Sequence, residues 1–462
     1  MDDLGTLRST YALKPDLILT PEGVRRGAVM KVDGNRIVSI GDGGEDAAHA
    51  LRLPGCAIVP GFVDAHTHLG QAFGKSFVFG EPSQIWQRIW GPVESTMTPE
   101  LVEAAATSMC IESLRGGFTT IVNFAMGDEA KTASMHAAAA KTGIRLVSCA
   151  GASDLADYPI PAGIKPRFFT IDQAIERAER HLAMCRNTSR VTASFCCSGI
   201  QGATDVMIAE LAAYCARNGV LFQFHSNEHF PEIHNCILRY GVRPIELLAD
   251  LGVLGRHVLL HHCTLVNERE IELLAESGTG VSYNPVASAW KGDGVAPAMS
   301  FIERGVRFGI GTDSTRSNAL RLVDAAETAQ RLTQGLPKLD FSCGAGWRWI
   351  EAATKGGANV AGLADTTGVL AAGYAADFLI LDMQRLETLP SWDFEWELVR
   401  LYDRDQIEAV FVDGKIRTRK GKAVDIDETE LIENRIPRAI ESVKASGARR
   451  FHGSSESRRK RP

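Results

Sequence analysis

The chain has 462 residues, of which 45% are hydrophobic and 23% are charged, a composition typical of globular proteins. Its formal net charge of -6 at pH 7 gives no overall electrostatic reason to bind nucleic acid or an anionic membrane surface. No apolar run approaches the ~18 residues that a membrane helix needs, and residues 1–20 lack the basic and apolar regions of a secretion signal. We therefore expect a small-molecule substrate, with no nucleic-acid or membrane partner.

The ten cysteines are scattered along the chain and form no Cys-x-x-Cys pair. Cys196 and Cys197 are adjacent, a spacing that suits neither a zinc knuckle nor an ordinary disulfide framework. Others lie in apolar runs, where a free cysteine behaves as a small buried hydrophobic residue. This usage is typical of a reducing compartment, so we expect the protein to be cytoplasmic.

Both ends of the chain have a β-rich pattern. Short strand-like runs separated by turn residues occupy residues 1–59, and similar runs return in residues 368–425. We expect these two parts to pair into one small composite β-sandwich. Residues 426–462 are expected to form a C-terminal helix and a partly disordered basic tail that ends in Arg458, Arg459, Lys460 and Arg461. A role for this tail in nucleic-acid binding or targeting is the less favoured interpretation.

The middle of the chain, residues 60–367, alternates between apolar β-branched runs and Ala/Glu/Leu-rich stretches with helical spacing. The runs are 56–66, 118–124, 145–151, 190–197, 219–225, 257–263, 280–285 and 307–313. Eight strands, most of them followed by a helix, predict an α/β fold with a closed parallel (β/α)8 barrel. An open doubly wound sheet is the alternative, but no glycine-rich dinucleotide loop follows the first strand.

Ionisable residues stand at the carboxyl ends of these runs, where barrel active sites are built. The first run ends in His66-Thr67-His68, and residues two apart in a strand point to the same face. The fifth run ends at His225, the sixth at His261-His262 and the eighth at Asp313. Three imidazoles and a carboxylate that meet at one mouth form a zinc-type ligand set that leaves room for water. The prediction depends on the whole set, because a single histidine at a strand end is usually structural.

The chain also resembles a known family in five segments. They are Val59-Pro-Gly-Phe-Val-Asp-Ala-His-Thr-His68, His262-Cys263, Asn284-Pro285, Gly311-Thr-Asp-Ser314 and Gly368-Val-Leu-Ala-Ala-Gly-Tyr-Ala-Ala-Asp377. These segments look like signatures of the amidohydrolase superfamily, and in particular of its branch of cytosine, guanine and S-adenosylhomocysteine deaminases and triazine hydrolases. The resemblance runs in order from about Asp16 to Val424. It implies a (β/α)8 barrel with a β-sandwich built from both chain ends. Separately, we expect the protein to be a homo-oligomer.

The resemblance also implies roles for individual residues. His66, His68, His225 and Asp313 would be the metal ligands, and His262 would lie near the attacking water. His261 is the rival of His262, since strand alternation allows only one of the two to point inward. Binuclear members need a carboxylated lysine on a middle strand, and neither 145–151 nor 190–197 contains lysine. One divalent metal ion per chain is therefore expected, zinc first and ferrous iron as the alternative.

The deaminase branch carries His-x-x-Glu after the fifth strand, and here the segment is His225-Ser-Asn-Glu228. Attack on a C=N carbon is easier when a carboxylic acid protonates the ring nitrogen. Glu228 is predicted to play this part, while Asp313 moves the proton of the attacking water and His262 stabilises the developing charge. The alternative for Glu228 is a solvated carboxylate at the start of a helix.

The sequence departs from members that act on adenosyl substrates at three places. Ala193–Cys197 offers no substrate-facing histidine, Ile85 rather than glutamate precedes Trp86, and Tyr283 stands where histidine is usual. These departures argue against a nucleoside. Trp86, Gln201 and Tyr283 are the expected substrate contacts, although the aromatic residues of segment 73–94 could equally pack in the core.

The function predicted from the sequence is therefore hydrolytic deamination of a small pyrimidine, purine or triazine. Amide, urea or carbamate hydrolysis and aromatic dechlorination are the alternatives on the same site. An inactive scaffold of the same fold is less favoured, since the ligand set is intact.

Overall fold

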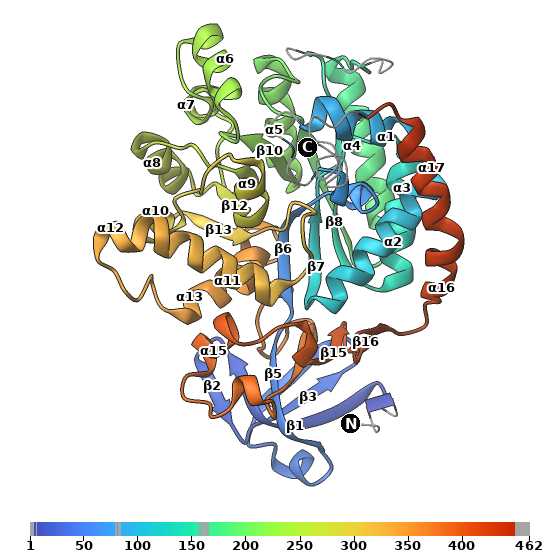
Figure 1. Cartoon of the computed structure of the whole chain (residues 1–462), viewed down its shortest axis with the longest axis vertical. Helices are drawn as coiled ribbons and strands as arrows, with labels where there is room; N and C mark the ends of the chain where they lie inside the picture. Colours follow the sequence, from blue (N-terminus) through green and yellow to red (C-terminus); the bar gives the residue numbers. More distant parts are fainter. Residues whose placement is uncertain are drawn as a thin grey trace, which may run out of the picture.

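We describe a computed structural model of the chain, in which residues 4–5, 7–78, 81, 85–156, 160 and 166–448 are described. The basic tail from Arg449 onward lies outside the described residues. A barrel forms the larger part of the molecule, and a sheet made from both chain ends lies below it (Figure 1). Within the described part of the chain, no helix is long and apolar enough to cross a membrane.

Eight parallel strands form the barrel sheet, in the unbroken order β13-β12-β11-β10-β9-β8-β7-β6. They are β6 (Phe62–Thr67), β7 (Phe118–Asn123), β8 (Arg145–Gly151), β9 (Val191–Cys197), β10 (Leu221–Ser226), β11 (Val258–His262), β12 (Gly280–Tyr283) and β13 (Arg307–Ile310). The segment after β13 closes the ring against β6, because the amide of Thr312 donates to Asp64 (2.9 Å) and that of Asp313 to the His66 carbonyl (2.8 Å). The predicted barrel is confirmed.

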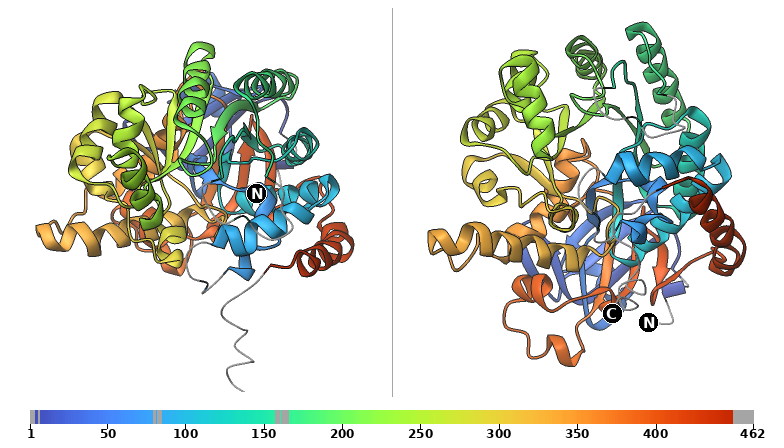
Figure 2. Two further views of the ribbon diagram at one scale, coloured as in Figure 1. Left: turned by 90° about the horizontal axis from the view of Figure 1, so that it is seen from above. Right: turned by 45° about the horizontal axis from the view of Figure 1, so that its top comes forward.

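Helices surround this ring, as the view from above shows (Figure 2). The longer ones are α2 (Pro99–Arg115), α3 (Glu129–Thr142), α4 (Ile171–Arg186), α5 (Asp205–Asn218), α6 (Phe230–Tyr240), α8 (Glu268–Ser277), α11 (Ala319–Gln330) and α17 (Ile436–Ala445). The shorter ones are α1 (Gly91–Thr96), α7 (Pro244–Asp250), α9 (Pro285–Lys291), α10 (Ala298–Arg304), α12 (Leu336–Lys338), α13 (Gly346–Glu351), α14 (Gly357–Val360), α15 (Phe394–Arg400) and α16 (Glu428–Glu430). Side-chain caps such as Thr98, Asp128 and Thr204 accept the first free amides and so fix where helices begin.

The second sheet has nine strands in the order β17-β16-β15-β14-β5-β1-β3-β4, and β2 pairs with β1. Its N-terminal strands are β1 (Thr10–Thr20), β2 (Gly23–Arg26), β3 (Val29–Asp33), β4 (Arg36–Gly41) and β5 (Leu51–Pro60). The C-terminal strands are β14 (Phe378–Asp382), β15 (Ile407–Val412), β16 (Lys415–Arg419) and β17 (Lys422–Ala423). The pairing of β5 with β14 joins the two chain ends, as expected from the sequence.

The first predicted run, 56–66, is divided between the two sheets, which corrects the sequence analysis. β5 ends at Pro60 in the terminal sheet and β6 begins at Phe62 in the barrel, with Gly61 between them. A Cβ atom at Gly61 would lie 2.2 Å from Thr119 Oγ1, so only glycine allows this close passage of the backbone. The strand that carries His66 therefore continues directly from the terminal sheet.

Candidate active site

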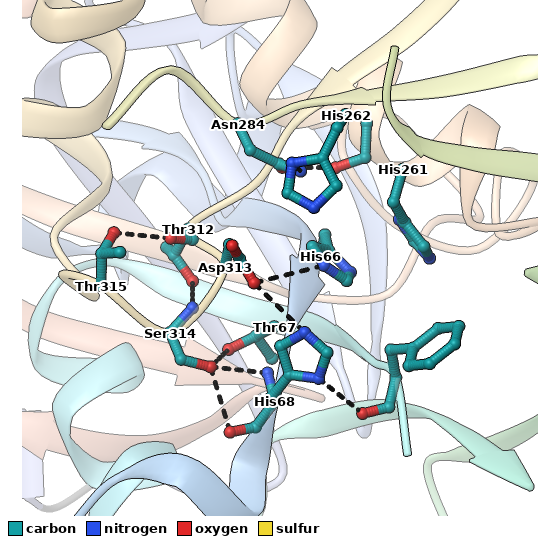
Figure 3. Close-up of polar contacts among 12 residues, drawn as sticks. His66, Thr67, His68, His261, His262, Asn284, Thr312, Asp313, Ser314 and Thr315 are labelled. Carbon is teal, nitrogen blue, oxygen red and sulfur yellow. Dashed lines mark hydrogen bonds and ion pairs between the residues drawn. The ribbon is translucent and has the colours of Figure 1, made fainter. Parts of the chain in front are cut away.

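Four of the predicted side chains, those of His66, His68, His262 and Asp313, lie close together at the carboxyl end of the barrel strands (Figure 3). Asp313 Oδ1 lies 3.4 Å from His66 Nε2 and 3.1 Å from His68 Nε2. The His68 ring donates from Nδ1 to the Phe124 carbonyl (3.0 Å), which leaves Nε2 with a lone pair directed at the cluster. Two ring nitrogens and one carboxylate oxygen thus face a common point.

The backbone around Asp313 adopts an unusual conformation to place its side chain. Asp313 and Ser314 both have left-handed backbone angles, with φ of 47° and 61°, which non-glycine residues rarely adopt. The Ser314 hydroxyl accepts from the His68 amide at 2.7 Å and so ties this turn to the end of β6. Local strain of this kind is typical of functional sites.

His225 completes the group from the end of β10, with its ring centroid 5.0 Å from that of His66 and 5.8 Å from that of His68. His66, His225 and His262 also bring one nitrogen each within 4.8 Å of one another. The structure therefore brings together all four predicted ligands, His66, His68, His225 and Asp313. Their role as ligands stays a prediction.

The expectation that only one of His261 and His262 points inward is wrong. The His261 ring stacks on His66 with centroids 3.8 Å apart and pairs with Gln223 Oε1 at 2.9 Å. His262 has a φ of 72°, which breaks the strand alternation and turns its ring toward the same interior. The amide of Asn284 donates to His262 Nδ1 (3.2 Å), so His262 Nε2 carries the proton and faces Glu228 Oε1 at 3.4 Å.

Burial keeps three of the imidazoles neutral, which is the form that binds a metal. It lowers the pKa of His66 and of His262 to about 3, and it also lowers the pKa of His225. His68 differs, because burial would lower its pKa but the hydrogen bond and the charge of Asp313 raise it. Burial would raise the pKa of Asp313, but Lys291 and the histidines hold it well below the usual range. The site therefore combines three neutral imidazoles, those of His66, His225 and His262, with the ionised carboxylate of Asp313 near neutral pH.

The donor set fits a divalent metal ion. Neither ring nitrogen of His66 has a hydrogen-bond partner among the described residues, although both are buried. An unpaired buried ring nitrogen is costly, and a metal ion held by His66, His68, His225 and Asp313 would give the Nε2 atom of His66 a partner. Three histidines and one carboxylate are a common zinc ligand set.

Glu228 lies beside this cluster and is held from several directions. Its Oε1 accepts from Lys291 Nζ at 2.6 Å, and its Oε2 lies 3.4 Å from His229 Nε2. The amide of Glu228 donates to the Glu232 carboxylate (3.0 Å). Burial would raise the pKa of Glu228, but His229, His262 and Lys291 hold it well below its usual range. Glu228 is therefore not a solvated carboxylate.

A cavity of about 430 Å³ opens onto the cluster. His68, His225, Glu228 and Asp313 line its floor, and the predicted substrate contacts Trp86 and Gln201 line its walls. Tyr283 does not line this cavity, so its prediction as a substrate contact is wrong. It is buried, and its hydroxyl donates to the Ala326 carbonyl (3.2 Å) and accepts from Gln330 (3.1 Å) in the helix layer.

Lys291 and His229 also belong to this site, although neither residue was predicted from the sequence. Lys291 Nζ contacts both Glu228 Oε1 and Asp313 Oδ2, the latter at 2.7 Å. His229 pairs with Asp293 Oδ1 at 2.9 Å. Burial would lower the pKa of His229, but the carboxylates of Glu228 and Asp293 raise it to about 9. The Lys291-Gly292 pair is a helix-end signal, but nothing in it shows where the lysine points.

Histidines and carboxylates stand at the carboxyl ends of the barrel strands and border a cavity, which is the place where barrel enzymes have their active sites. Residues 57–417 match the amidohydrolase family. The chain is 30% identical to a 5-methylthioadenosine/S-adenosylhomocysteine deaminase of Natronomonas pharaonis over 88% of this chain and 92% of that protein. The chain therefore belongs to the amidohydrolase family and is a hydrolase of this family, which confirms the resemblance stated from the sequence.

Solved structures agree on the fold. An adenosine deaminase from Xanthomonas campestris with bound zinc superposes with a TM-score of 0.84 at 22% identity, over 94% of this chain and 98% of that chain. An atrazine chlorohydrolase from Arthrobacter aurescens, complexed with zinc, gives a TM-score of 0.81 at 19% identity, over 94% and 100%. At these identities the likeness shows the fold alone.

Proposed function

We propose that the protein catalyses the hydrolytic deamination of a small aminated nitrogen heterocycle. The observation that carries this proposal is the position of Glu228, which lies between the histidine and aspartate cluster and the cavity. Its carboxylate is 3.4 Å from His262 Nε2, and Glu228 lines the cavity. A carboxyl group at this position can transfer a proton to a ring nitrogen of a heterocyclic substrate. An acyclic amide or urea has no ring nitrogen that could accept this proton.

Glu228, Asp313 and His262 each have a separate role in the proposed reaction. Glu228, which is ionised at rest, takes one proton of the attacking water and gives it to the ring nitrogen beside the carbon that loses its amino group, as that carbon becomes tetrahedral. Asp313 takes the other proton of the water and passes it to the departing amine. The Nε2–H of His262 donates to the oxygen on which negative charge develops. A divalent metal ion, with zinc first, would be held by His66, His68, His225 and Asp313 and would lower the pKa of the water.

The cavity supports a flat, largely apolar substrate. Trp86 and Trp90 line it together with Phe124 and Met126, and such walls suit an aromatic ring. Ile85, which precedes Trp86, also lines the cavity and has no group that could bind the hydroxyls of a sugar. The named relative from Natronomonas pharaonis acts on adenosine derivatives, whereas these residues favour a free pyrimidine, purine or triazine base.

An ammonia-release screen tests this proposal. The zinc-loaded protein is incubated with amino-pyrimidines, amino-purines and amino-triazines, and with aryl ureas and acyclic amides as the comparison set. We expect ammonia or a small amine to leave while the ring survives as its oxo product, which mass spectrometry identifies. Turnover confined to the ureas and amides, with carboxylic acid or carbon dioxide as product, would overturn the proposal.

A further inference from the structure

Lys291 reaches the active site from the end of a short, well-defined turn. It is the last residue of α9, and Gly292 ends the helix with a φ of 77°. The amide of Gly292 donates to Ala289 (3.2 Å) and that of Asp293 to Ser288 (2.9 Å), as in a helix-ending Schellman turn. This turn fixes the backbone from which Lys291 and Asp293 extend.

The contact with Lys291 determines the orientation of the Asp313 carboxylate. The two oxygens of this carboxylate face opposite partners. Oδ1 lies 3.4 Å from His66 Nε2 and 3.1 Å from His68 Nε2, whereas Oδ2 accepts from Lys291 Nζ at 2.7 Å. A carboxylate bound in this way offers one oxygen to the histidine side and cannot rotate without losing the lysine.

Lys291 also holds Glu228. Oε1 of Glu228 accepts from Lys291 Nζ at 2.6 Å, and Oε2 faces His229, which Asp293 anchors at 2.9 Å. The same α9 turn therefore supplies Lys291 to one oxygen directly and Asp293 to the other through His229.

Two ionised carboxylates this close need a cation between them. Single oxygens of Glu228 and Asp313 and a nitrogen of His262 lie within 4.8 Å of one another, and the side chains of Glu228 and Asp313 are 11% and 6% exposed. Like charges in such a weakly screened place repel each other. Lys291, with a side chain only 16% exposed, is the cation that touches both.

We propose that Lys291 is a positioning residue that fixes Asp313 and Glu228 together, so that Asp313 presents a single oxygen to the metal ion. The part that concerns Glu228 rests on the proposed function, whereas the part that concerns Asp313 does not. Groups behind metal ligands change metal affinity or activity by about 10–100-fold when they are removed.

The test compares Lys291→Met with Lys355→Met. Lys355 is a matched control, since it also pairs with one glutamate, Glu351 at 2.9 Å, but its side chain is 61% exposed and far from the site in sequence. The affinity of each metal-free protein for Zn2+ alone is measured by competition with a chelating dye, after circular dichroism has shown that both variants are folded. We expect Lys291→Met to bind Zn2+ about tenfold more weakly or worse, and Lys355→Met to bind it as the parent does.

A second variant separates positioning from simple repulsion. In Lys291→Met combined with Glu228→Gln the two carboxylates no longer face each other, but Asp313 still lacks its partner, so the weak Zn2+ binding should persist. A smaller loss than about threefold in both variants, or tighter binding, would overturn the proposal. This measurement needs no substrate. If no heterocyclic amine is deaminated, the proposed function fails while the affinity still decides the role of Lys291. If one is deaminated, Lys291→Met should lower kcat far more than it changes KM.

Discussion

Replacing Glu228 by glutamine keeps the shape of the side chain but removes the proton that it would transfer. The amide oxygen of glutamine can still accept from Lys291, which lies 2.6 Å from Oε1. The backbone amide remains held by Glu232 at 3.0 Å. The fold of the site should therefore survive, and the change tests the chemistry of this one group.

The expected decrease in turnover follows from the loss of proton transfer by Glu228. A positioned acid contributes about 10²–10⁴-fold to the rate, which corresponds to about 3–5 kcal/mol of transition-state stabilisation. Glu228 is not among the four predicted ligands, so Glu228→Gln should hold as much metal as the parent protein. The loss should fall on kcat, since the ring still packs against the same cavity walls.

The assay is steady-state ammonia release with the best heterocyclic amine from the screen, alongside metal analysis of each preparation. Glu351→Gln is the matched control, because Glu351 pairs with exposed Lys355. Near-normal turnover of Glu228→Gln with full metal content would refute the acid role of Glu228. The carboxylate would then be a structural partner of Lys291 and His229.

Three further predictions concern the metal and the stability of the fold. Elemental analysis of protein purified without chelator should give about one divalent metal per chain, and His225→Ala should lose most of it; two tightly held ions, or activity without metal, would contradict this. Arg145→Met should lower the free energy of unfolding, measured by urea denaturation, by about 3–5 kcal/mol. The reason is that Arg145 donates hydrogen bonds of 3.1 Å and 3.3 Å to the fully buried carboxylate of Asp377, which would lose its cationic partner. An unchanged urea midpoint would contradict this prediction. Burial, together with the charge of His181, lowers the pKa of His136 from 6.5 to about 4. As the pH drops from about 6.5 to 4, the imidazole is therefore protonated in the unfolded chain before it is protonated in the folded protein, and the stability of the fold decreases. His136→Gln should flatten this part of the plot of melting temperature against pH, and an equally steep plot would contradict the prediction.

The strand and helix pattern of the middle of the chain was sufficient to predict the barrel. Parallel barrel strands are buried on both faces, so they read as continuous apolar runs that end in polar residues. Since active sites of barrels lie at these ends, the same pattern also located His66, His68, His225 and Asp313. Pairing of the two chain ends was expected from their shared β-rich texture, but the exact junction at Gly61 depends on a close contact with Thr119 that no local pattern reveals.

The parts that could not be predicted depend on backbone angles and on the aim of side chains. His262 breaks strand alternation through a positive φ, so both adjacent histidines face the interior. Tyr283 follows the alternation and points into the helix layer, away from the cavity. Lys291 and His229 extend from a helix end and from a loop after a strand, and spacing alone does not show that they meet at Glu228.

The direct passage from β5 into β6 has a consequence for how the protein is made. β5 is held on one side by β14, which the ribosome adds only after the whole barrel has been synthesised. The strand that carries His66 therefore lacks its final anchor until synthesis is nearly finished. We therefore expect a nascent chain that stops within the barrel to bind metal less well than the finished protein does, since β5 then lacks its pairing with β14.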